Sequence, residues 1–127
     1  MSRTQGRTDG APPPSGPFSQ SVRIGSVVAA AGQVGMRPDG TTLDGVGAQT
    51  HQALANVAKV LEASGASMDD VVTMRVFLTD TSQFDEMNKV YAEAFGAPYP
   101  ARTTVYVGLP DPFLIEIDAL AVVGATA

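Results

Sequence analysis

Apolar residues recur with different periods along the chain, and the changes of period mark out its first elements. Residues 18–23 alternate as a short strand, and a glycine-containing turn joins them to a second strand over residues 26–31. From Val46 onward, apolar residues fall three and four positions apart, up to Gly65. The pattern therefore predicts a β-hairpin followed by a helix over about residues 46–64.

The second half of the chain repeats this change of period. Residues 71–78 are rich in β-branched side chains and predict a strand with apolar residues on both faces. Ser82, with Asp85 three residues later, resembles a capping box and predicts the start of a second helix, which Gly96 ends.

Two further strands are predicted over residues 101–107 and 114–123, which gives the order β-β-α-β-α-β-β of an α+β fold. Two helices can cover one face of such a sheet. The strands over residues 71–78 and 114–123 are apolar on both faces, so a large apolar face stays uncovered in a single chain. We therefore expect a closed homo-oligomer.

The N-terminal residues differ in composition from the rest of the chain. Residues 1–14 are rich in Gly, Pro, Ser and Thr, which predicts a flexible arm before a single domain over residues 15–124. They lack the apolar core of a signal peptide, and no apolar run in the chain approaches membrane-spanning length. We expect a cytoplasmic protein with no membrane partner.

Charge and composition exclude several kinds of site. The chain of 127 residues has a net charge of −5, a pI of about 4.5 and no cluster of Lys or Arg, which argues against a nucleic-acid partner. It contains no cysteine, so neither a disulfide nor a thiol nucleophile is available. His51 is the single histidine, which excludes a multi-histidine metal site.

The remaining candidate chemistry lies in carboxylates and arginines. Glu116 and Asp118 share one face of the strand over residues 114–123, where they are costly unless paired or hydrated. Arg75 and Arg102 are available partners, and Arg102 lies just inside a strand after a proline-rich loop. Two interpretations stay open: an ion-pair network inside an oligomer interface, or a small polar pocket for an anionic substrate.

Seven short motifs run through the chain in order. They are Gly16-Pro17-Phe18-Ser19-Gln20, Ala31-Gly32-Gln33, Gln49-Thr50 with Asn56-Val57, Val76-Phe77-Leu78-Thr79-Asp80, Asn88-Lys89-Val90-Tyr91, Pro100-Ala101-Arg102-Thr103 and Ile115-Glu116-Ile117. Together and with their spacing, they resemble the RidA/YjgF family of enamine/imine deaminases over roughly residues 12–123.

This resemblance implies a fold and an assembly. The fold is chorismate-mutase-like (ferredoxin-like), an α+β fold with a mixed sheet and two helices on one face. The assembly is a homotrimer whose sheets form a central β-barrel, with active sites in the clefts between subunits.

The resemblance also implies a reaction and the residues that perform it. The reaction hydrolyses 2-aminoacrylate-type enamines, or their imine tautomers, to a 2-oxo acid and ammonia, with no cofactor and no metal. By matching motifs, Arg102 binds the substrate carboxylate, assisted by the backbone N–H of Thr104. Glu116 orients or activates the hydrolytic water, and Asn88 lies near the site.

Two substrate-binding positions depart from the family pattern. Phe18 stands where tyrosine is common, and Ala31, next to Gly32, stands where serine is common. Each change removes a hydroxyl from the pocket, an effect of about 0.5–1.5 kcal/mol per lost hydrogen bond. That changes which substrate fits without removing the Arg102 anchor, and we predict a bulkier or less polar imine.

Other functions are compatible with the same motifs. The chain is alternatively a non-catalytic trimer that binds a small carboxylate or acts as a chaperone, or a dedicated pathway deaminase or tailoring enzyme. Tyr91 falls on the apolar stripe of the second predicted helix and is expected in the core or an interface. Arg75 and Asp118 are interpreted as a structural pair within the trimer.

Overall fold

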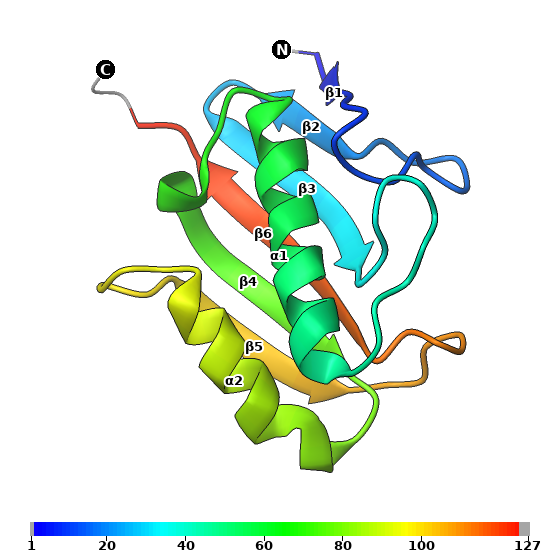
Figure 1. The fold of residues 1–127 in the computed structure, drawn as a ribbon. Helices are drawn as coiled ribbons and strands as arrows, with labels where there is room; N and C mark the ends of the chain where they lie inside the picture. The colour runs from blue at the N-terminus through cyan, green and yellow to red at the C-terminus, as the bar shows by residue number, and fades with distance from the viewer. Residues whose placement is uncertain (1, 125–127) are drawn as a thin grey trace.

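The computed structural model describes residues 2–124, which form one mixed sheet with helices packed on one of its faces (Figure 1). The sheet order is β1-β2-β3-β6-β4-β5; β4 and β5 run parallel and the other neighbours antiparallel. The predicted α+β class is confirmed. The elements are β1 (Thr4–Gly6), β2 (Ser21–Ile24), β3 (Val27–Val34), α1 (Val46–Glu62), β4 (Val71–Leu78), α2 (Phe84–Glu93), β5 (Ala101–Tyr106) and β6 (Ile115–Val122), with 3-10 turns at Met68–Asp70 and Thr81–Gln83.

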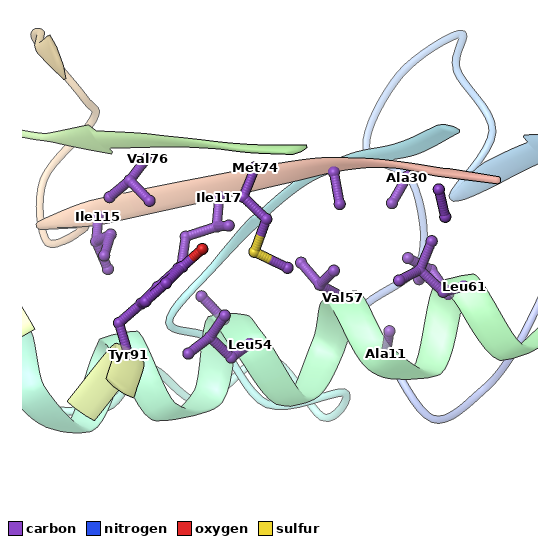
Figure 2. Close-up of a cluster of buried hydrophobic side chains, with 14 of the residues drawn as sticks. Ala11, Ala30, Leu54, Val57, Leu61, Met74, Val76, Tyr91, Ile115 and Ile117 are labelled. Atoms are coloured by element: carbon purple, nitrogen blue, oxygen red, sulfur yellow. The ribbon is translucent and has the colours of Figure 1, made fainter. Parts of the chain in front are cut away.

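The core lies between α1 and the sheet. Side chains of one parity on β4 and β6, including Met74, Val76, Ile115 and Ile117, are fully buried beneath the helices (Figure 2). Helix α1 contributes an apolar stripe that contains Leu61 and ends before Gly65, whose φ of 85° requires glycine. Neither helix within residues 2–124 has the length and apolar character needed to cross a membrane.

The opposite face of the sheet carries apolar side chains that stay exposed in a single chain. Val27, Val105, Leu120 and Val122 lie on strands β3, β5 and β6 and are each more than a third exposed. On β3 and β6 they take this face because their strand neighbours of the other parity, Val28, Ala119 and Ala121, are buried under the helices. The apolar face predicted from the sequence is therefore present.

The N-terminal segment differs from the predicted flexible arm. Strand β1 pairs with β2, and Ala11 is 2% exposed within the core. The buried Gln20 side chain holds the segment: its Oε1 accepts from the Thr8 N–H at 2.8 Å, and its Nε2 donates to the carbonyls of Thr8 at 3.0 Å and Pro12 at 2.9 Å. A buried amide that satisfies backbone groups orders a segment whose composition alone predicts disorder.

Two element boundaries also differ from the prediction. Strand β3 continues past Ala31 to Val34, through a bulge between Ala30 and Gln33 where its pairing with β6 shifts register. The turn before α2 is capped by Asp80, which accepts the Ser82 N–H at 2.9 Å, rather than by Ser82 itself. A 3-10 turn precedes α2, so the cap lies earlier than the apolar period indicates.

Replacing Ala11 by aspartate tests whether the N-terminal segment is part of the domain. Ala11→Asp places a carboxylate in the core and is expected to lower the free energy of unfolding by roughly 1–3 kcal/mol, measured by urea denaturation. Ser15→Asp, at an exposed position of the same segment, is the matched control and is expected to change little. Equal stability of the two variants would show that the segment is dispensable.

Candidate active site

Arg102 lies on the edge strand β5 and extends over the helix side of the sheet. Its Cα pairs with that of the buried Met74, and neighbouring side chains in a ladder share a face. The guanidinium carbon is 4.8 Å from the Tyr91 ring centroid and 5.7 Å from that of Phe84, and Nη1 donates to Met87 Sδ at 3.8 Å. Helix α2 thus holds the cation through aromatic faces and a thioether.

No carboxylate of residues 2–124 forms an ion pair with Arg102. The contacts on α2 use its π-face and one donor, so other N–H groups stay available to a planar anion. A half-buried guanidinium without a counter-ion is an anion-binding group.

A pocket of about 510 Å³ opens beside this guanidinium, lined by α2 and by the loop that leads into β5. Two buried polar atoms on α2, Asn88 Oδ1 and Tyr91 Oη, make no hydrogen bond within the described part of the chain. Burial raises the pKa of Tyr91, and the positive charge of Arg102 opposes that shift, so the hydroxyl is neutral at physiological pH. Buried atoms of this kind normally have a partner, and both belong to residues that line the pocket beside Arg102. The lining residues are Asn88, Tyr91, Ala92, Tyr99, Pro100 and Arg102.

Thr104 continues the same side of β5 as Arg102. It is half-buried and pairs with Val76, whose side chain is under the helices. Because β5 is an edge strand, part of its backbone faces away from β4 and is available to a ligand or another chain.

Glu116 lies on the opposite face of the sheet. Its Cα pairs with Val34 on β3 and with Phe77 on β4, while its strand neighbours Ile115 and Ile117 are buried under α1. Burial raises the pKa of Glu116, and the nearby Asp118 carboxylate raises it further.

Gly32 makes room for the Glu116 carboxylate. A Cβ at this position would overlap Glu116 Oε2, so glycine is needed for the close approach. Ala31 precedes it in the bulge and donates its N–H to the Gln20 carbonyl at 2.9 Å. Phe18 lies before β2 and its side chain is half exposed.

The predicted site residues therefore form two groups. Arg102, Thr104 and Asn88 lie on the helix side near the β5 edge, whereas Gly32 and Glu116 meet on the open face. Strand β4 separates β5 from β6, so a single chain does not bring Arg102 and Glu116 together. The sequence did not reveal this because the face that Arg102 takes depends on its pairing with β4.

Two other sequence interpretations are resolved by the structure. Arg75 and Asp118 do form an ion pair, within one chain. Tyr91 is buried as predicted, but its place beside Arg102 was missed. Its spacing of three from Asn88, which puts both on one helix face, was the available signal. Residues 2–124 contain no cluster of three or more metal-binding side chains.

Known proteins with similar sequences and structures cover nearly the whole chain. The family described as "Endoribonuclease L-PSP" matches residues 8–123. A "RutC family protein" of Pyrococcus horikoshii is 44% identical over 90% of this chain and 93% of its own length. A "2-iminobutanoate/2-iminopropanoate deaminase" of Dermatophagoides farinae is 40% identical over 89% of this chain and 91% of its own length.

A solved structure extends the similarity to three dimensions. The crystal structure of RidA from an Antarctic Psychrobacter species superposes with a TM-score of 0.91 at 37% identity, covering 94% of this chain and 99% of that one. Together with the order of motifs along the sequence, these matches show that the chain belongs to the RidA/YjgF family.

Proposed function

We propose that this protein hydrolyses 2-aminoacrylate-type enamines and their imine tautomers to 2-oxo acids and ammonia. The observation that carries the proposal is the half-buried Arg102 guanidinium, which has no carboxylate partner within residues 2–124 and lies beside the unsatisfied Asn88 Oδ1. Arg102 supplies two parallel donors for the substrate carboxylate. Asn88 Oδ1 accepts a hydrogen bond from the substrate nitrogen, a donor that carboxylates without a nitrogen atom lack.

The chemistry needs little beyond positioning. The imine carbon is already electrophilic, and Glu116 accepts a proton from water as the water oxygen bonds to that carbon. As the C=N bond opens, Glu116 returns that proton to the nitrogen, which gives the carbinolamine. The carbinolamine hydroxyl then transfers its proton through Glu116 to the nitrogen, the C–N bond breaks as the C=O bond forms, and a 2-oxo acid and ammonia leave. Holding the carboxylate and one water at the right distance supplies most of the barrier reduction in such a reaction.

Opposite faces for Arg102 and Glu116 require two copies of the chain. We place the reaction between subunits of a homotrimer, in which the sheets form a central barrel and the edge strand β5 of one chain approaches the open face of the next. That packing covers the exposed side chains of Val27, Leu120 and Val122. It gives each Arg102 a Glu116 of the partner subunit.

The pocket wall favours larger or less polar substrates than the family's small imines. Phe18 and Ala31 have no hydroxyl group. A pocket lined by side chains without hydroxyls accepts apolar substrate groups, because no buried polar group is left without a hydrogen-bond partner. Thr104 contributes a backbone N–H to the carboxylate site in this proposal.

Two alternatives use the same pocket. A protein that binds a small carboxylate without turnover needs Arg102 but not Glu116. RNA cleavage, named in the family description, is disfavoured by the net charge of −5 and by the lack of a Lys or Arg cluster in the sequence.

Arg102→Ala tests the anchor. It is expected to lower kcat/KM for 2-aminoacrylate by roughly 10- to 100-fold, the loss of a charge-assisted hydrogen-bond pair. 2-Aminoacrylate is generated by a serine dehydratase, and its decay is followed with and without the protein. Arg37→Ala, at an exposed arginine on another loop, is the control and is expected to retain full activity.

The outcomes separate the alternatives. No acceleration by the unmodified protein rejects the deaminase, and carboxylate binding that Arg102→Ala abolishes then identifies a binder. Undiminished acceleration by Arg102→Ala rejects the site.

Mixed assemblies test the shared site. Arg102→Ala and Glu116→Gln chains are each expected to be strongly impaired, whereas an equal mixture co-refolded from denaturant regains full activity in roughly a quarter of the sites, the fraction that pairs two intact half-sites in a random cyclic trimer. Each variant refolded alone is the control. A mixture as inactive as its components places both residues in one chain's site.

Substrate size tests the pocket wall. Imines made by an amino-acid oxidase from leucine or an aromatic amino acid are expected to react with a kcat/KM higher than that of the alanine-derived imine. Phe18→Tyr with Ala31→Ser is expected to shift the preference toward the small imine, by about threefold to tenfold. A preference of the unmodified protein for the alanine-derived imine would sink this part of the proposal.

A further inference from the structure

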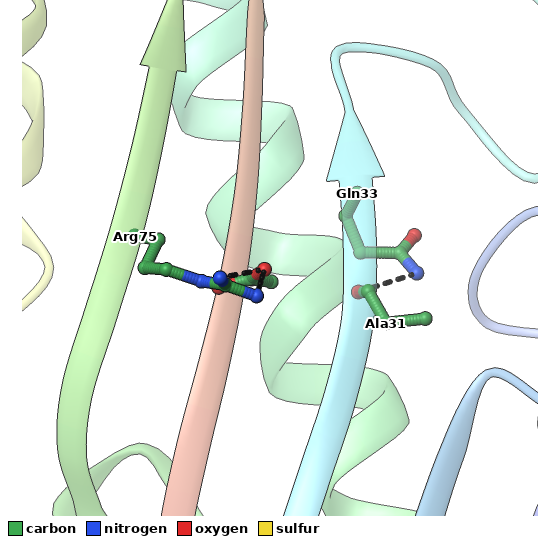
Figure 3. A network of polar contacts seen from close by, with 4 residues as sticks. Ala31, Gln33 and Arg75 are labelled. Atoms are coloured by element: carbon green, nitrogen blue, oxygen red, sulfur yellow. Dashed lines mark hydrogen bonds and ion pairs between the residues drawn. The ribbon is translucent and has the colours of Figure 1, made fainter. Parts of the chain in front are cut away.

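A two-point ion pair lies on the open face of the sheet, beside Glu116. Arg75 on β4 donates through Nε to Asp118 Oδ1 at 3.0 Å and Oδ2 at 3.1 Å, and through Nη2 to Oδ2 at 2.7 Å (Figure 3). The two residues are Cα partners across β4 and β6. Asp118 follows Glu116 by two residues, so both carboxylates share one face of β6.

The ion pair between Arg75 and Asp118 contributes little to the folding stability of a single chain. The Arg75 side chain is 64% exposed, and ion pairs with an exposed partner contribute little to folding. The geometry is nevertheless specific, since the guanidinium fork contacts both carboxylate oxygens. The pair thus fixes the position of the Asp118 carboxylate more than it holds the sheet together.

The charged groups that face Glu116 come from two strands. On β6 the neighbour on the same face is Asp118. On β4 the apolar Phe77 is the Cα partner of Glu116, and Arg75, two residues away on the same face, is the Cα partner of Asp118. The β3 neighbour Gly32 is uncharged and lies against the carboxylate. Arg75 is therefore the cation on this face closest in register to the two carboxylates.

We propose that Arg75 is a positioning residue for the deaminase reaction: by holding Asp118 in a two-point ion pair, it offsets part of the charge of the carboxylate beside Glu116 and so favours an ionised Glu116 for proton transfer from water. The inference rests on the function proposed above, because it gives Glu116 the part of the base. Arg75 acts through Asp118 and need not contact substrate.

Distance and sign support the coupling. Residues two apart on a strand are separated by roughly 6.5–7 Å, which is within the Debye length of about 8 Å at physiological ionic strength. The Asp118 charge disfavours ionisation of Glu116, in the direction of the raised pKa of that carboxyl. A bound guanidinium of opposite charge weakens this repulsion.

Opposite effects of the two partners provide the test. The acidic limb of the pH profile of kcat/KM is measured for Arg75→Gln, Asp118→Asn and the double variant, with the uncatalysed rate subtracted at each pH. Arg75→Gln moves the limb to higher pH, so that activity near about pH 5 falls about threefold while the alkaline plateau and KM stay unchanged. Asp118→Asn moves it to lower pH, and the double variant lies between Asp118→Asn and the unmodified protein. Arg75→Lys keeps the charge and is expected to restore most of the profile.

A titration without substrate separates this inference from the proposed function. With carbon-13-labelled glutamate, the Glu116 carboxyl signal is assigned by its loss in Glu116→Gln and followed against pH in every variant by NMR. Its midpoint is expected to move up in Arg75→Gln and down in Asp118→Asn. The other glutamates serve as internal controls: Glu62, Glu86 and Glu93.

Each result decides one statement. A Glu116 midpoint that is the same in all variants overturns the coupling, whether or not the protein is active. Shifted midpoints with an unmoved pH profile overturn the part of Arg75 in the reaction. Shifted midpoints in a protein without deaminase activity leave the coupling supported and reject the proposed function. Should Arg75→Gln fail to fold, the Glu116 midpoint of the double variant, expected above that of Asp118→Asn, decides the case, and equal midpoints overturn the coupling.

Discussion

The two-residue period of β6 is the constraint on which the rest of this structure depends. The strand lies between β3 and β4, so both of its edges are paired and its side chains have two faces to occupy. Ile115 and Ile117 fill the core under α1, which forces Glu116 and Asp118 to the open face. The register of β6 therefore sets both the core packing and the position of the carboxylates, because a slip by one residue would bury Glu116 and Asp118 and expose Ile115 and Ile117.

That arrangement works against stability at neutral pH. Because burial raises the pKa of Glu116, the folded chain binds this proton more tightly than the unfolded chain does. The resulting stabilisation is complete below the ordinary pKa of a glutamate and is lost as the pH rises through the raised value. An ionised Glu116 at neutral pH is thus retained at a cost in stability, as is usual for groups that take part in proton transfer.

Much of the fold follows from local patterns in the sequence, but the site does not. The helical spacing before Gly65 and the alternation of residues 114–123 predict α1 and β6 closely, because each signal lies within its own element. The N-terminal segment is ordered by the Gln20 side chain, and β3 is extended by pairing with β6, both of which are contacts distant in sequence. In the same way, Arg102 is predictable as a candidate from its motif, whereas its face depends on the parallel register of β5 against β4.

The two groups of candidate site residues differ in how the chain holds them. Arg102 is held by the aromatic rings and thioether of α2, which fix its position without neutralising its charge. Asp118, by contrast, is paired with Arg75 within the chain. The chain thus pairs the Asp118 carboxylate, which lies beside Glu116, and leaves the Arg102 guanidinium without a carboxylate partner within residues 2–124. A counter-ion for Arg102 inside the chain would stabilise the monomer and would compete with a substrate carboxylate for the same donors. Its absence from residues 2–124 is what a preorganised anion site requires.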